Sequence, residues 1–214
     1  MSDLFSGLIQ ESISGIALGC IYALIALGFT LIYKATEVVN FAQGEIMMVG
    51  AYINFFFVTQ FTGMVGGLNG WVFLAALFCS TIFAVLFGIV LDLIISRPLK
   101  DEPVFSIIMA TISLAIILRS LTAMIAGPIS LVPVSPFGDS TIKVGGIVIS
   151  VLDLAIIISA IILMGIFFFF FNKTRWGIAM KATSEDSEAA QLMGIPVKNV
   201  YRMVWVFAAI VGVV

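Results

Sequence analysis

Carboxylates gather in one short segment of the sequence, from Thr183 to Gly194, which contains Glu185, Asp186 and Glu188. Histidine, the commonest general base and a frequent metal ligand, is absent from the chain. No nucleophile stands in a recognisable pairing with a base, so the sequence predicts neither catalysis nor a metal site. The chemistry open to these carboxylates is charged and hydrogen-bonded contact with a binding partner.

The same segment has the signals of a short helix with defined ends. Thr183 or Ser184 can act as the N-cap, and the acidic residues that follow lie favourably at the positive end of the helix dipole. Gly194 stands where a left-handed C-cap belongs, and Pro196 prevents continuation of the helix. These signals predict a helix of about ten residues, ~15 Å long.

Two features of this helix suit a partner surface. Ala189 and Ala190 leave room for close approach, and Leu192, Met193 and Ile195 supply an apolar edge. An ordinary amphipathic connector that lies on a bilayer has the same pattern. The pattern alone leaves both interpretations open.

The rest of the chain is strongly apolar. With 62% hydrophobic and 10% charged residues and a mean hydropathy of +1.23, it lies far outside the range of soluble domains. The sequence therefore predicts an all-α, polytopic membrane helix bundle. Cys20 and Cys79 both fall in apolar runs, where we expect free thiols. The net charge of −2 indicates neither nucleic-acid binding nor a general electrostatic attraction to anionic lipid.

A helix needs ~20 residues to cross a bilayer, and five apolar runs of the chain are close to this length or longer. A sixth run begins near Met203 and reaches only Val214, which is too short to cross, so we expect a C-terminally truncated chain whose residues 1–214 form a single domain. The five complete predicted spans are Ile13 to Tyr33, Ile46 to Phe61, Trp71 to Ile95, Val104 to Ala126 and Ile149 to Phe171.

The distribution of lysine and arginine predicts the orientation, because basic loops stay in the cytoplasm. We expect a multi-pass protein with its N-terminus outside and a cytoplasmic loop at 172–202. Only Lys143 then lies outside, in an external connection whose residues 141–148 could form a small hairpin. The basic residues that this topology places inside are Lys34, Arg97, Lys100, Lys173, Arg175, Lys181, Lys198 and Arg202.

A polar segment precedes the second predicted span. Asn40 as N-cap and Gln43 three positions later would form a capping box, with Glu45 favourable in the first turn. Alternatively Asn40, Gln43, Gly44 and Glu45 line a translocation path or its cytoplasmic gate, since irregular backbone at membrane depth is tolerated only beside protein or water. Both interpretations can hold together.

Other intramembrane features concern the packing of the spans. Arg119 is costly within a span, and Asp153 at the start of another is a candidate partner for it; snorkelling of Arg119, or its contact with a substrate carboxylate or a docking protein, is the alternative. Gly15, Gly19 and Ala23 form a stripe of small residues at which another helix can pack closely. We favour helix packing over substrate contact for the stripe.

Several motifs together resemble a known family. Glu188-Ala189-Ala190 followed by Gly194 resembles the EAA loop of the permeases of ATP-binding-cassette (ABC) importers. The order of the remaining motifs resembles the branched-chain amino acid (Liv-type) permeases over nearly the whole chain. These motifs are YALIALGFTLIY at residues 22–33, VNFAQGE at 39–45, RPL at 97–99 and WGIAMKA at 176–182.

The resemblance implies a permease domain with a coupling loop at 172–202 and no catalytic residues of its own. It implies cytoplasmic ATPase subunits, a second, homologous permease subunit, an extracytoplasmic solute-binding protein and membrane lipid as partners, in a bacterial inner membrane. Because this chain has no phosphate-binding loop, ATP and magnesium would be used by the partner subunits. The residues implied to contact the ATPase are Glu185, Asp186, Glu188, Ala189, Ala190, Met193 and Gly194.

Other functions remain open at this stage. A related permease could carry another small solute, such as urea or an amide. A secondary transporter or channel would need more central ionisable groups than this chain has. An intramembrane enzyme is disfavoured by the absence of histidine and of a nucleophile paired with a base.

Overall fold

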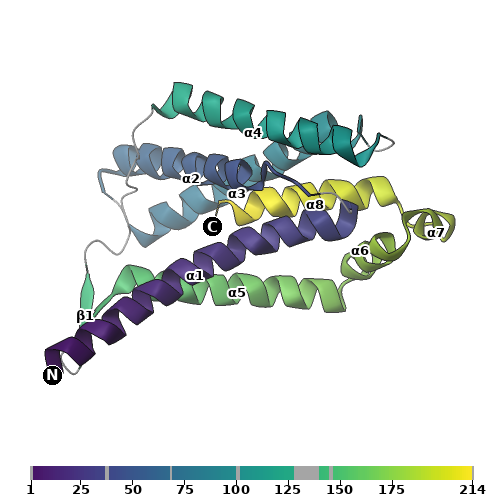
Figure 1. Cartoon of the computed structure of the whole chain (residues 1–214). Helices are drawn as coiled ribbons and strands as arrows, with labels where there is room; N and C mark the ends of the chain where they lie inside the picture. The colour runs from purple at the N-terminus through teal and green to yellow at the C-terminus, as the bar shows by residue number, and fades with distance from the viewer. Residues whose placement is uncertain are drawn as a thin grey trace.

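The computed structural model describes residues 2–36, 39–67, 69–99, 102–127, 140–144 and 147–213, and is dominated by helices (Figure 1). Within these residues, five helices are long and apolar enough to cross a membrane, which confirms the five predicted spans and the all-α fold class. The helices extend a few residues beyond several of the predicted bounds. They are α1 (Ser2–Thr36), α2 (Gln43–Val65), α3 (Gly70–Leu91), α4 (Val104–Ala126) and α5 (Val151–Lys173).

The predicted sixth span corresponds to α8 (Val197–Val211), which begins six residues earlier than expected. Pro196 stands at its N-cap, where the absence of an N–H group costs nothing because the first N–H groups of a helix have no partner within it. The predicted loop at 172–202 therefore ends sooner, and Arg202 belongs to a helix. The residues from Val197 onward are recruited because their apolar side chains can enter the bundle.

Helix α8 lies at the centre of the bundle, where it contacts α1, α2 and α3 (Figure 1). Val200, Val204 and Ala208 on one of its faces are buried. Glycines bring neighbouring backbones close to it: a Cβ added at Gly88 on α3 would lie 2.7 Å from the Cα of Val206. The central contacts of the bundle are therefore made at backbone distance.

The two ends of the bundle differ. At the end that holds the N-terminus, β1 (Thr141–Val144) and β2 (Ile147–Ser150) pair in an antiparallel manner, which confirms the predicted hairpin. At the other end, α6 (Arg175–Glu185) and α7 (Ser187–Leu192) connect α5 to α8 (Figure 1). The described basic residues expected inside lie on the elements of this second end.

A π-helix, η1 (Asp92–Ser96), continues α3 toward the same end. Such wide turns are rare and often occur at functional sites. Here the π-helix places Asp92 in the interior, where its side chain is 1% exposed.

Candidate functional site

The acidic segment forms a shorter helix than the sequence predicted. Thr183 and Ser184 are not its N-cap: they lie within α6, where their hydroxyl groups donate to the carbonyl oxygens of Ala179 and Lys181. Asp186 is extended, with φ −157° and ψ 107°, and this separates α6 from α7. Helix α7 has six residues rather than about ten.

Asp186 is the N-cap of α7. Its Oδ1 accepts hydrogen bonds from the N–H groups of Glu188 and Ala189, both at 2.9 Å. Gly194 has φ +84°, as expected for the glycine of a C-cap, and the N–H of Ile195 donates to the carbonyl of Ala190 at 3.0 Å. Both ends of α7 are therefore fixed by hydrogen bonds. Glu185, which was predicted to belong to the same helix, is instead the last residue of α6.

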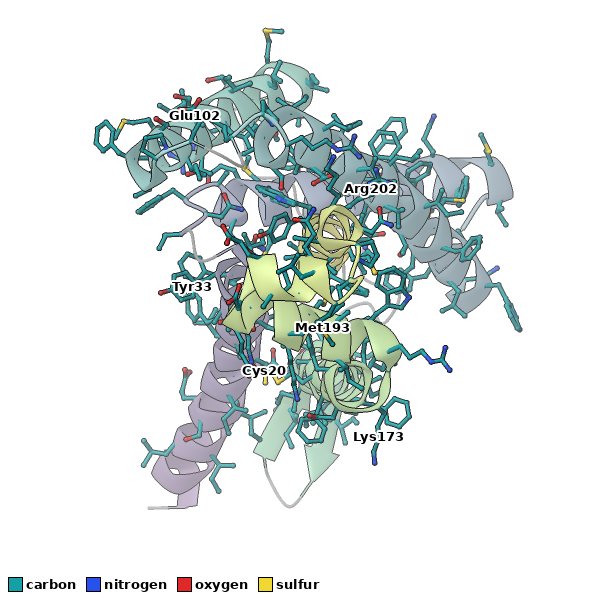
Figure 2. All side chains as sticks on the ribbon, turned by 90° about the vertical axis from the view of Figure 1, so that its right-hand side faces the viewer. Cys20, Tyr33, Glu102, Lys173, Met193 and Arg202 are labelled. Atoms are coloured by element: carbon teal, nitrogen blue, oxygen red, sulfur yellow. The ribbon has the colours of Figure 1, made fainter. Side chains whose placement is uncertain are left out.

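The side chains of α7 point in two directions. Leu192 and Met193 are 88% and 84% exposed, and Glu188 and Ala189 are also exposed. Ala190 is buried at 4% exposure, so within the predicted alanine pair only Ala189 is open to a partner. Figure 2 shows Met193 near the centre of this end of the molecule. The exposed side chains of Leu192 and Met193 form a small apolar knob of a size suited to a hydrophobic groove on a partner.

Helix α6 is held closely against the end of α5. Thr174 Oγ1 accepts from the N–H of Gly177 at 3.1 Å and thereby caps α6. A Cβ at Gly177 would lie 2.5 Å from the carbonyl oxygen of Phe170, so only glycine permits this sharp connection. A displacement of α6 and α7 would therefore also displace the adjoining ends of α5 and α8.

Asp92 joins α3 to the start of α8. Arg97 Nε donates to Asp92 Oδ2 at 3.4 Å. Arg202 Nε also lies 3.6 Å from Asp92 Oδ2. This second contact was missed because Arg202 was assigned to a loop; the only sequence signal was an acidic residue in an apolar run.

The predicted capping box at the start of α2 is wrong. Ala42 is the N-cap, and no side chain caps it. Asn40 Oδ1 instead accepts from the N–H of Ala42 at 3.0 Å, in a local turn that precedes the helix. The amide of Gln43 is buried against α1, where a Cβ at Gly28 would lie within 3 Å of its Nε2.

This segment enters the bundle before α2 begins. Arg119 lies ~22 Å along α4 from its start, yet its Nη2 donates to Oε1 of Glu45, in the first turn of α2, at 2.6 Å. The N–H of Phe41 donates to Oγ1 of Thr111, which lies about two turns into α4, at 3.4 Å. Phe41 and the first turn of α2 therefore lie inside the bundle, beside α4.

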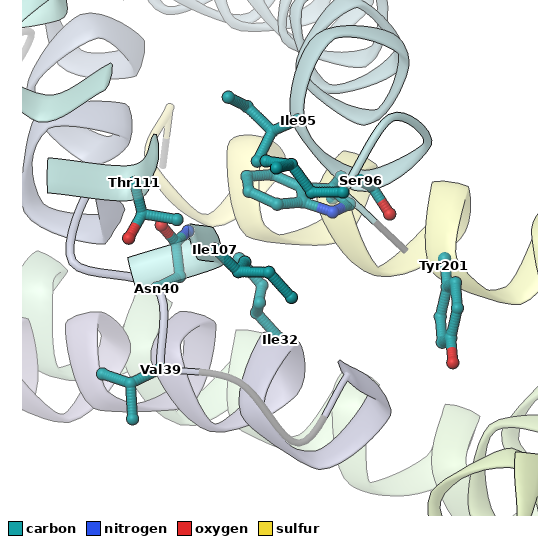
Figure 3. Close-up of a pocket in the computed structure, with 10 residues that line it drawn as sticks. Ile32, Val39, Asn40, Ile95, Ser96, Ile107, Thr111 and Tyr201 are labelled. Atoms are coloured by element: carbon teal, nitrogen blue, oxygen red, sulfur yellow. The ribbon is translucent and has the colours of Figure 1, made fainter. Parts of the chain in front are cut away.

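A cavity of about 70 Å³ adjoins this segment. Asn40, Ser96, Thr111, Tyr201 and Trp205 contribute polar groups to its lining, together with aliphatic side chains such as Ile32 and Ile107 (Figure 3). Asn40 Nδ2 and Trp205 Nε1 are buried and have no hydrogen-bond partner among the described residues. Two donors beside a cavity indicate a site for acceptor groups, such as ordered water or a passing polar solute.

The predicted pair of Arg119 and Asp153 does not form. Arg119 pairs with Glu45, and Asp153 Oδ2 accepts from Ser14 Oγ on α1 at 2.7 Å. Asp153 follows the hairpin at one end of the bundle, whereas Arg119 faces α2. Glu45 was missed as the partner of Arg119 because that contact depends on how α2 enters the bundle.

Two of the three small residues of the stripe on α1 do not pack against the described part of the chain. Gly15 and Gly19 are exposed, and a Cβ at either would meet no described atom within 4 Å. Ala23 is partly buried. The face of α1 that enters the bundle carries Ala17 and Leu24 instead, so close packing at the stripe stays a prediction for another polypeptide.

Comparisons with known proteins match almost the whole chain. The family model described as the branched-chain amino acid transport system permease component matches residues 12–214. The high-affinity permease protein BraD of Pseudomonas aeruginosa is 30% identical over 214 residues, which are 96% of this chain and 68% of that protein. The corresponding LivH of Escherichia coli K12 is 29% identical over 220 residues, covering 100% of this chain and 71% of LivH.

The probable branched-chain amino acid transport permease protein LivH of Methanocaldococcus jannaschii is 27% identical over 220 residues, which are 100% of this chain and 66% of that protein. No solved structure matches the chain. The extent of the family match, together with five helices able to cross a membrane, supports the resemblance drawn from the motifs. The chain belongs to the family of permease components of branched-chain amino acid transport systems.

Proposed function

We propose that this chain is a membrane-spanning subunit of an ATP-driven importer that moves branched-chain amino acids into the cell. The observation that carries the proposal is α7, which presents Leu192 and Met193 beyond the bundle and leads directly into the central helix α8. A lever that is exposed at its tip and buried at its base can transmit work from a neighbouring subunit. The names of the related permeases supply the class of substrate.

The tip of α7 is the docking site for a cytoplasmic ATPase subunit. Leu192 and Met193 enter a hydrophobic groove on that subunit, and Glu188 and Ala189 border the contact. Asp186 and Gly194 act by fixing the ends of α7 rather than by touching the partner. ATP and magnesium are bound by the ATPase, and this chain contributes no catalytic group.

Movement passes from α7 to the membrane helices through α8. Arg202 is in the second turn of α8 and contacts Asp92 in the π-helix, so displacement of α8 acts on the end of α3. The close approach of Gly88 to α8 makes the same two helices move together. This route joins the ATPase contact to the packing of the spans.

The translocation path lies along the α2 and α4 face that carries Glu45 and Arg119. Arg119 is 75% exposed at a depth where a charge facing lipid is costly, so this face is covered by water or by a second permease subunit. Asn40 and Gln43, on the segment that enters the bundle, form the cytoplasmic gate of this path. An extracytoplasmic binding protein delivers the amino acid at the hairpin end, where the N-terminus lies outside the cell.

Reconstituted vesicles test the proposal. The complete transporter, with its ATPases and cognate binding protein, should take up leucine, isoleucine and valine in competition with one another and only when ATP is supplied. Uptake of urea or an amide alone would assign another cargo. Uptake driven by an ion gradient without ATP would show that the protein is a secondary transporter and would overturn the importer proposal.

Crosslinking tests the docking site separately. A cysteine at Ala189, which is exposed, should capture the ATPase subunit, whereas a cysteine at the buried Ala190 should not. Capture of lipid or of this same chain alone, with no ATPase, would rule out α7 as the docking site.

A further inference from the structure

A second and larger cavity, of about 430 Å³, opens where α1, α5, α6 and α8 meet. Its volume lies within the range typical of small-molecule sites. Leu31 from α1, Phe171 from α5, Met180 from α6 and Val204 from α8 give it an apolar lining. The cavity is separate from the one beside Asn40 and shares no lining residue with it.

Two lysines lie at the edge of this apolar space. Lys34 comes from the last turn of α1 and Lys181 from α6, and both are exposed. Lys181 Nζ donates to Asn172 Oδ1 at 2.9 Å, which holds the ammonium group beside the cavity and leaves it two further N–H donors. The described lining contains no carboxylate, and neither lysine forms a salt bridge with a described residue.

The position of the cavity fits the level of lipid headgroups. Lys34 and Asn172 lie at the ends of α1 and α5, two helices that can cross the bilayer. Leu31 and Leu27 lie about one and two turns deeper on α1 and continue the lining toward the membrane interior. An occupant would therefore need an apolar part directed into the membrane and a negative part at its surface.

We propose that this cavity binds one anionic phospholipid. Part of an acyl chain occupies the space between Leu31, Phe171 and Val204, and the phosphate lies between Lys34 and Lys181. Basic pockets between membrane helices bind such headgroups by the same combination of contacts. The net charge of −2 gave no reason to expect this affinity, because it averages over a local pair of cations. Since Lys34 is on α1 and Lys181 on α6, the phosphate bridges the bundle to the helix that precedes α7.

Lipid binding to the intact transporter tests this assignment. The chain is purified with its subunits, and retained phosphatidylglycerol is measured by native mass spectrometry against phosphatidylcholine. K34Q/K181Q should lower the affinity for phosphatidylglycerol by ~25-fold, since each lysine near a membrane surface contributes about fivefold. K173Q/K198Q removes the same charge from the same end of the protein, outside the cavity, and should change the affinity less than about twofold.

A third variant separates shape from charge. Thr30 lines the cavity and is exposed, so T30F should fill part of the acyl site and reduce lipid retention while both lysines remain. Equal losses in K34Q/K181Q and K173Q/K198Q would show general electrostatic attraction and overturn the proposal, as would unchanged binding in the first pair. A monodisperse elution profile for each variant excludes misfolding as the cause of a loss.

Soluble glycerol phosphate distinguishes a lipid from phosphate alone. It carries the headgroup charge without acyl chains and should displace phosphatidylglycerol only weakly. Complete displacement would identify a simple phosphate site and overturn the lipid assignment. Protection of the cavity by another subunit, with no lipid retained, would do the same. All of these readouts measure binding, so they stand or fall independently of transport.

Discussion

Arg119 on α4 donates a 2.6 Å hydrogen bond to Glu45 on α2, although the two residues are 74 positions apart. Arg119 lies deep along α4, while Glu45 is in the first turn of its helix. The pair therefore shows that α2 begins inside the bundle, beside the middle part of α4. It also places two opposite charges on a face of the chain that lipid would solvate poorly.

Replacement of Glu45 by glutamine should impair both stability and transport. The change leaves Arg119 without a carboxylate at membrane depth, so we expect the apparent melting temperature in detergent and the rate of uptake to fall. The R119Q/E45Q double variant should recover part of the stability, with a coupling of about 0.5–2 kcal/mol. Strictly additive effects, or normal transport by E45Q, would contradict a role for the pair in the path.

The contacts of Asp92 predict a difference between two arginines. R202Q removes the link between α8 and η1, whereas R97Q removes a contact within one stretch of chain. Stimulation of ATP hydrolysis by the loaded binding protein should therefore be lost in R202Q and largely kept in R97Q. Equal stimulation in both variants would show that the Arg202 contact plays no part in coupling.

Removal of the shared carboxylate should cost more than removal of either arginine. D92N leaves two cations facing a neutral amide, and we expect a loss of about 1–3 kcal/mol in the free energy of unfolding. The loss stays below that of a fully buried pair because the arginine side chains are 42% and 40% exposed. Thermal unfolding in detergent measures it, and an unchanged midpoint would contradict this account.

Substitutions on α7 should separate docking from folding. L192D and M193D each lose an exposed apolar contact, so affinity for the ATPase should fall about tenfold or more while the fold is retained. A190L instead introduces a larger side chain at a buried position and should lower the melting temperature. Pull-down with the ATPase and thermal unfolding distinguish the two classes. Full binding by L192D and M193D together would exclude the knob as the contact.

Two glycines offer a matched test of the central packing. G88A places a Cβ 2.7 Å from the backbone of α8 and should cost about 1–3 kcal/mol. G165A, in the middle of α5, meets no described atom within 4 Å and should be neutral or slightly stabilising, because alanine favours helix. A similar melting temperature for both variants would show that α3 and α8 can separate without cost.

The membrane spans could be predicted from the sequence because their signal is local. A run of apolar residues long enough to cross the bilayer leaves few alternatives for its backbone, so the five spans and the hairpin were placed correctly. Pro196 and Gly194 likewise marked the end of α7. These features depend on the residues of one segment.

Predictions failed where the answer depended on distant contacts. Asn40 and Gln43 have the spacing of a capping box, but packing of the Gln43 amide against Gly28 draws it into the bundle. Asp153 was the predicted partner of Arg119, and the way in which α2 enters the bundle brings Glu45 to Arg119 instead. At the acidic segment, both Ser184 and Asp186 are good N-caps, and the extended conformation of Asp186 decides between them.

The central place of α8 has a consequence for biogenesis. Helices α1, α2 and α3 are synthesised first, yet the surfaces that they bury are completed by a segment from Val197 onward. Until α8 is synthesised, the surfaces of these three helices that contact it have no partner within the subunit. Assembly of the subunit is therefore completed late, and a nascent chain that ends before α8 lacks the element that unites them.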